Sequence, residues 1–97
     1  MPDGQDLPLA MLKANLGYFD SAIPAALEAY LQNLLEKARQ DLSDHENIFV
    51  IPNDPSDTGL LVMYAAWLYR KASTGEGKPP MLREEIRNRQ VSSATAW

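Results

Sequence analysis

The sequence predicts an all-α fold, a small bundle of about four helices, and three observations lead to this class. Apolar residues recur at steps of three and four across residues 23–42, which is the period of an amphipathic helix. Residues 60–69 (LLVMYAAWLY) are apolar without interruption. Aspartate, serine, proline and glycine, the residues that begin and end helices, separate these segments. A chain of 97 residues has room for one core, so residues 1–97 are expected to form a single domain.

The first helix is expected at residues 7–16. Asp6 can cap its start, and Pro8 suits the first turn, where a missing backbone N–H removes no helical hydrogen bond. Gly17 has the conformational freedom with which helices commonly end. One face carries three leucines, Leu9, Leu12 and Leu16. This short helix should therefore pack against the rest of the bundle along that face.

The second helix, at residues 22–43, has the clearest pattern in the chain. Asp20 or Ser21 can cap its start. Its apolar face consists of Ile23, Leu27, Tyr30, Leu31, Leu34, Leu35, Ala38 and Leu42. Charged and amide side chains occupy the opposite face. Residues 45–47 are expected to form a loop. Residues 48–51 should form at most a short extended segment, because β-branched and aromatic residues there precede a proline.

The third helix is expected at residues 55–73, after a polar stretch that offers several caps. Pro55 suits its first turn. From Leu60 onward the pattern is apolar nearly all round, which is typical of a helix that other parts of the protein cover on most sides. The expected core combines this helix with the second one and consists of Leu27, Leu31, Leu34, Leu61, Tyr64, Trp67 and Leu68.

The C-terminal part differs from the rest in both flexibility and charge. Residues 75–79 (GEGKP) predict a soft elbow before a fourth helix at residues 80–89. This helix has three apolar anchors, Met81, Leu82 and Ile86. Residues 79–97 are therefore expected to form a basic helix with a mobile tail. Segment 83–97 should be loosely held until it meets a partner.

Charge is divided unevenly along the chain. Residues 1–69 hold three Lys/Arg and ten Asp/Glu, giving −7, whereas residues 70–97 hold six and three, giving +3. The acidic body argues against a molecule that seeks nucleic acid as a whole. The basic part is either a partner-binding segment or an ordinary solvated helix. No signal peptide is expected at the N-terminus, and the longest apolar run is far below the ~20 residues that cross a bilayer, so no membrane partner is expected.

Nothing in the sequence points to catalysis. There is no cysteine, and His45 is the only histidine, among acidic neighbours that would diverge rather than converge on a metal. Residues 53–57 (NDPSD) lack the alternating ligands and central glycine of a calcium loop. The glycines at residues 75–77 follow no predicted strand, so they do not form a phosphate-binding loop. We therefore expect no enzyme activity, no metal and no cofactor.

Two segments in this order carry a family resemblance. VMYAAWLYRKA at residues 62–72 is followed by PMLREEIRNR at residues 80–89. The chain resembles the small head–tail connector (adaptor) proteins of long-tailed phages and prophages. Members often carry an aromatic-rich YAAWLYRKR helix and a later helix with the pattern P-x-MLR…NNR. This sequence departs from that pattern at Arg87, where an asparagine is expected.

The resemblance implies a structural role. Such proteins are helical bundles without catalytic activity, commonly monomeric before assembly. They bind beneath the portal protein of a filled capsid as a ring of copies. The ring extends the channel through which duplex DNA passes without sequence-specific binding, and it docks a head-completion or tail protein. The resemblance therefore places this chain at the head–tail junction of a virion, after synthesis in the bacterial host cytoplasm.

The residues expected to contact partners combine aromatic side chains, which are favoured at subunit contacts, with basic and apolar residues of the C-terminal part. They are Trp67, Arg70, Met81, Arg83, Arg87, Arg89 and Trp97. The rival hypothesis is a small helical regulatory or partner-binding protein of a mobile element. A DNA-binding helix-turn-helix would need a compact turn before a basic helix, and residues 73–79 are too long for that turn.

Overall fold

The computed structural model describes residues 6–18 and 23–94, and within these ranges it contains four helices and no strand. The helices are α1 (Asp6–Asn15), α2 (Ala25–Glu46), α3 (Pro55–Thr74) and α4 (Pro80–Ala94). The predicted all-α class is therefore confirmed.

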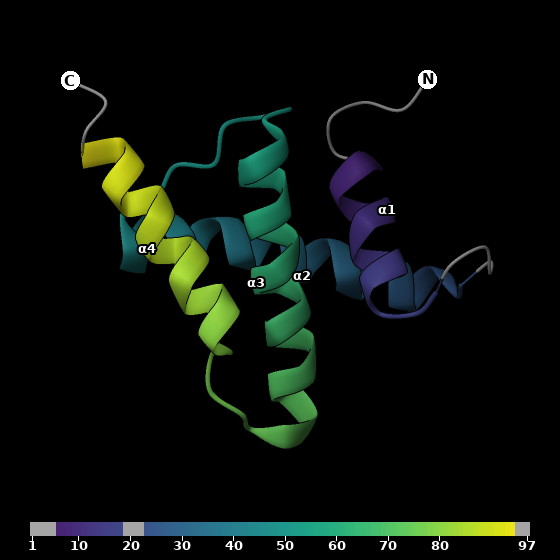
Figure 1. Ribbon diagram of the computed structural model, residues 1–97. Helices are drawn as coiled ribbons and strands as arrows, with labels where there is room; N and C mark the ends of the chain where they lie inside the picture. Colours follow the sequence, from purple (N-terminus) through teal and green to yellow (C-terminus); the bar gives the residue numbers. More distant parts are fainter. Residues whose placement is uncertain (1–5, 19–22, 95–97) are drawn as a thin grey trace.

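Helix α3 stands at the centre of the molecule (Figure 1). Helices α1 and α4 lie on opposite sides of it, and α2 crosses behind α3. Helix α3 contacts each of the other three helices, most extensively α2. The molecule is flattened, with principal extents of 44 × 36 × 20 Å. The central position explains why the sequence of α3 is apolar nearly all round, since no broad side of this helix is left for solvent.

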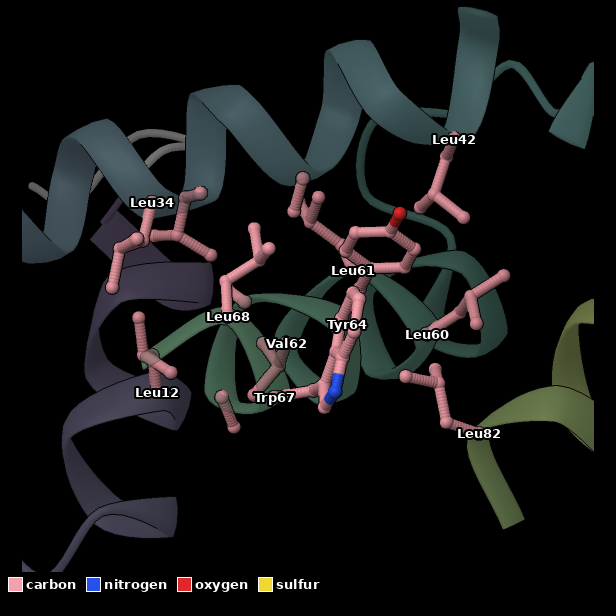
Figure 2. Packing of buried hydrophobic residues seen from close by; sticks show 14 of the residues in the cluster. Leu12, Leu34, Leu42, Leu60, Leu61, Val62, Tyr64, Trp67, Leu68 and Leu82 are labelled. Atoms are coloured by element: carbon pink, nitrogen blue, oxygen red, sulfur yellow. The ribbon is translucent and has the colours of Figure 1, made fainter. Parts of the chain in front are cut away.

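The core lies where α3 meets the other helices, and each helix contributes leucines to it (Figure 2). Its buried apolar residues are Leu9, Leu12, Leu31, Leu34, Leu35, Ala38, Leu42, Ile48, Leu60, Leu61, Val62, Tyr64, Ala65, Ala66, Trp67, Leu68, Leu82 and Ile86. Six of the seven predicted core residues are among them. The exception is Leu27, which is only partly buried and packs at the edge of the cluster. No helix of the described part is long and apolar enough to cross a membrane.

Helix α2 differs from its predicted bounds at both ends. It begins at Ala25 rather than 22, because Pro24 has the extended backbone of a residue that precedes a helix. The two predicted caps, Asp20 and Ser21, lie outside the described residues. The helix continues through residues 45–46, which were predicted to be a loop, and ends where Asn47 adopts a left-handed conformation with φ 57°. Polar residues of its last turn remain helical because they lie on an exposed side.

Helix α3 has the ends that the sequence predicted. The Asp54 carboxylate accepts a hydrogen bond of 2.9 Å from the backbone N–H of Asp57, and Pro55 occupies the first turn. At the other end Gly75 has φ 68°, and its N–H donates to the Lys71 carbonyl at 2.8 Å. These capping contacts satisfy backbone groups that a helix leaves unpaired at its ends.

Helix α4 is longer than expected. It reaches Ala94 rather than 89, so the predicted mobile tail is helical to that point. Leu82 and Ile86 are buried against the rest of the protein, whereas the third predicted anchor, Met81, is exposed. That segment 83–97 is loosely held until it meets a partner stays a prediction, although its described part is helical. Residues 95–97 lie outside the described ranges.

The connection between α2 and α3 is irregular, and the short extended segment predicted at residues 48–51 is not a strand. Ile48 turns into the core and is 1% exposed. Phe49 and Ile51 point outward, at 66% and 54% exposed. This alternation places two large apolar side chains in solvent beside a buried one.

Candidate functional site

The seven predicted contact residues do not form one surface. Two of them, Trp67 and Arg89, make contacts within the protein that leave little of them exposed. Trp97 lies outside the described residues. The remaining four are exposed to solvent, Arg70, Met81, Arg83 and Arg87. The predicted contact residues therefore belong to separate parts of the molecule.

Trp67 is 6% exposed and holds the elbow after α3 in place, so the structure does not offer it to a partner. Its ring meets Tyr64 edge-on, with centroids 5.3 Å apart. Its indole N–H donates a 3.1 Å hydrogen bond to the Glu76 carbonyl. The Nζ atoms of Lys71 and Lys78 each lie 4.8 Å from its ring centroid, a distance at which a cation is attracted to the ring.

Lys78 joins the elbow to α2 as well as to α3. Its Nζ lies 4.0 Å from a Glu46 carboxylate oxygen and 5.7 Å from the ring centroid of Tyr64. Burial, together with the negative charges of Asp41 and Glu46, raises the pKa of Tyr64 to about 12, so this phenol stays neutral at physiological pH. The elbow is thus fixed by several contacts, although its two glycines predicted a flexible joint.

Arg89 and Asp57 form the most specific polar contact in the described structure. Asp57 is 2% exposed, and the Nε of Arg89 donates to its Oδ1 at 2.8 Å. A second guanidinium nitrogen lies 3.3 Å from the other carboxylate oxygen. That oxygen also accepts a 2.9 Å hydrogen bond from the backbone N–H of Ile51. Two-point pairing of this kind is the strongest form of charge-assisted hydrogen bond.

The same ion pair shifts the acidity of both partners. Burial alone would raise the pKa of Asp57, but hydrogen bonds from Arg89 and from the Ile51 N–H outweigh it and lower that pKa. The hydrogen bond to Asp57 raises the pKa of Arg89. Both groups are therefore held in their charged forms.

The Arg89–Asp57 pair fastens three segments together. Asp57 belongs to the first turn of α3, Arg89 to α4, and the bonded N–H of Ile51 to the connection between α2 and α3. Arg89 also donates to the carbonyl of Phe49 at 3.3 Å. The next residue, Gln90, donates a hydrogen bond from its side-chain amide to the Glu46 carbonyl at 3.0 Å. Arg89 thus stabilises the fold, and its predicted contact with a partner stays a prediction.

The exposed side of α4 carries the other predicted contacts on this helix. Met81 is 68% exposed, and Arg83 and Arg87 are also exposed. Neither of these two arginines forms an ion pair within the part of the chain that the structure describes. Arg70, at the end of α3, is separate from this group and donates a 3.1 Å hydrogen bond to the Asn15 side chain. Glu84 and Glu85 are also exposed on α4, so this helix presents a surface with a large apolar side chain and charges of both signs.

A groove lies on the far side of α2 from the core, and sequence reasoning did not predict it. Its volume is about 500 Å³, and it is lined by Glu36, Arg39, Gln40, Ser43, Asp44, Ile48, Phe49 and Val50. The Nε of Arg39 is buried and has no hydrogen-bond partner among the described residues. The outward turn of Phe49, which forms this groove, depends on a loop conformation that local sequence does not determine.

His45 lies in the last turn of α2, with its Nε2 3.9 Å from an Asp41 carboxylate oxygen one turn earlier. It is exposed. Within residues 6–18 and 23–94, no group of three or more histidine, cysteine, aspartate or glutamate residues could hold a metal ion.

Comparison with protein-family models, with curated proteins and with solved structures found no match for this chain. The resemblance to head–tail connectors accordingly stays a prediction.

Proposed function

We propose that the protein is a structural head–tail connector of a long-tailed phage or prophage. It would assemble as a ring under the portal protein, extend the DNA channel and dock a head-completion or tail protein. The two segments that carry the resemblance, residues 62–72 and 80–89, support this role in different ways. The first belongs to the buried central helix and builds the fold, while the second belongs to α4.

The observation that carries the proposal is the exposed surface of α4. A helix that serves only solubility needs no large apolar side chain, yet Met81 is 68% exposed on the same helix as the exposed Arg83 and Arg87. Methionine and arginine are both enriched at protein interfaces. A helix that is fixed to the core on one side and carries an exposed methionine and exposed arginines is suited to binding a protein partner.

The charge of the body is consistent with a DNA channel. Residues 1–69 carry a net charge of −7, and this sign repels the phosphate backbone. Duplex DNA would therefore pass such a surface without adhering to it. A regulator that binds an operator needs the opposite, a continuous basic surface that neutralises several phosphates.

The test combines the purified protein with the portal protein of the phage or prophage that encodes it. We expect the two to sediment together and electron microscopy to show an added ring at the narrow end of the portal. Deleting the gene should give DNA-filled heads that lack tails. Portal binding is also measured for two variants at exposed positions, Arg70→Glu and His45→Ala. Each variant is first checked for an unchanged fold. We expect His45→Ala to bind the portal as the parent protein does.

Two results would contradict the proposal. One is a protein that never sediments with its portal, with a deletion that leaves virions intact. The other is sequence-specific binding to promoter DNA, which would support the regulatory protein instead. The position of the gene, either after capsid and portal genes or beside a regulated operon, gives an independent observation.

A further inference from the structure

We infer that the exposed side of α4 of one copy docks into the groove along α2 of a second copy, beside its residues 48–50. The inference rests on the proposed function, because a ring of identical copies requires two different and complementary surfaces on each copy. The inference identifies these two surfaces as the exposed side of α4 and the groove along α2.

The groove offers both apolar and charged contacts. Phe49, 66% exposed, stands beside it, and Val50 contributes to its lining. Glu36 and Asp44 also line the groove; both are exposed, and neither forms an ion pair within the described residues. The buried Nε of Arg39 has no hydrogen-bond partner there. The groove therefore combines an apolar wall, two free carboxylates and one unsatisfied donor.

The exposed side of α4 has the matching set of groups. Met81 supplies an apolar side chain, and Arg83 and Arg87 supply two cations that have no ion pair within the described residues. Glu84 and Glu85 lie on the same exposed turns and can accept a hydrogen bond. Arginines would meet the groove carboxylates, a glutamate would satisfy the Arg39 donor, and Met81 would pack on the exposed aromatic ring. Charge complementarity of this kind determines partner choice and register.

We place the contact between two copies, because the surface of α4 that carries Arg83 and Arg87 is turned away from the core of its own chain. Leu82 and Ile86 hold α4 against the core, so its exposed residues face away from that core. Arg89 fixes the helix further through Asp57. The two surfaces are different, so the contact is head-to-tail, and each copy keeps one surface open for the next.

The two surfaces can be inactivated separately. In the groove variant, Glu36→Lys and Asp44→Lys reverse the two carboxylates. In the helix variant, Arg83→Glu and Arg87→Glu reverse the two arginines. All four positions are exposed, so circular dichroism and melting should match the parent protein. Glu76→Lys, a charge reversal at an exposed position between α3 and α4, is the control. Sedimentation velocity on the isolated proteins, up to about 1 mM, measures self-association.

We expect the parent protein and the Glu76→Lys control to self-associate as concentration rises. Each variant alone should require at least about tenfold higher concentration for the same association, since it presents one intact surface and one reversed surface. A mixture of the two variants should associate again at concentrations close to those of the parent protein. The intact helix of the groove variant meets the intact groove of the helix variant, and the reversed helix of the helix variant meets the lysines of the reversed groove, so charges are complementary at both contacts.

Three results would overturn the inference. They are a parent protein that stays monomeric throughout, variants that associate like the parent, and a mixture that associates no better than either variant alone. Portal binding is measured separately, so the two proposals can fail independently. Self-association of this kind without portal binding would contradict the connector function and support the contact between α4 and the groove. Portal binding with a mixture that stays monomeric would support the connector function and contradict that contact.

Discussion

Helices α3 and α4 are adjacent, yet they are held in different ways. Ten residues of α3 are buried, and they contact all three other helices. Helix α4 contacts the body through Leu82 and Ile86, and its position is then fixed by Arg89 and Gln90. Hydrophobic burial fixes the first helix, and a few directed polar contacts fix the second. The attachment of α4 should therefore depend on pH and on single polar side chains, whereas that of α3 should depend on its buried apolar side chains.

The largest expected effect is on the central helix. Leu61→Ala should lower the free energy of unfolding by about 3–5 kcal/mol, because Leu61 is 1% exposed and surrounded on all sides. Leu82→Ala should cost less, about 2–3 kcal/mol, because α4 can shift to close part of the cavity. Urea denaturation measures both values. A larger loss of unfolding free energy in Leu82→Ala than in Leu61→Ala would show that α4 depends on hydrophobic burial more than α3 does.

Removing the guanidinium that fixes α4 should be the next largest effect. Arg89→Ala leaves the buried Asp57 carboxylate without its partner, and we expect a loss of about 2–3 kcal/mol in unfolding free energy. Arg87→Ala is the matched control on the same helix, because Arg87 is exposed and has no ion pair within the described residues. It should change stability by less than about 0.5 kcal/mol. Equal effects from the two substitutions would show that the ion pair does not hold α4.

Acid should weaken the attachment of α4 selectively. The pKa of Asp57 is lowered in the folded protein. Its contribution to stability is therefore complete above the ordinary aspartate pKa of about 3.9 and is lost as pH falls through the lowered value. Urea denaturation of the parent and of Asp57→Asn across this range should show a difference that shrinks as pH falls. A difference that stays constant would exclude Asp57 as its source.

The smallest expected effect concerns the elbow between the two helices. Gly75 has φ 68°, which a side chain disfavours, and no atom lies within 4 Å of an added Cβ. Gly75→Ala should therefore cost about 1 kcal/mol through backbone strain alone. Gly77→Ala is the control, since Gly77 has equal space and no positive φ. Thermal unfolding of the two variants compares them, and a more stable Gly75→Ala would contradict the assignment.

The sequence predicted those parts of the fold that depend on local pattern. Four helices, the cap at Asp54 and the stop at Gly75 follow from residue type and periodicity alone. The end of α2 does not, because polar residues on an exposed side remain helical until the chain reaches a residue that accepts φ > 0, here Asn47.

The candidate surfaces were less predictable. Asp57 and Arg89 are 32 residues apart, and each resembles an ordinary helix-end or surface charge in the sequence. Their pairing depends on how α4 lies against α3, which no local pattern specifies. The exposure of Phe49 depends on the same packing, since Arg89 binds its carbonyl. Met81, Arg83 and Arg87, by contrast, are exposed candidates that the sequence alone identified.

The packing of Trp67 makes its fluorescence a measure of how α4 is attached to α3. The chain has two tryptophans, so Trp97→Phe leaves the indole at the elbow as the only one. That indole touches Lys71 from its own helix and both Glu76 and Lys78 from the segment that leads to α4. Water reaching the ring shifts its emission to longer wavelengths. The emission wavelength of Trp67 would thus report, without an added label, whether α4 and the segment before it are packed against α3 or displaced from it.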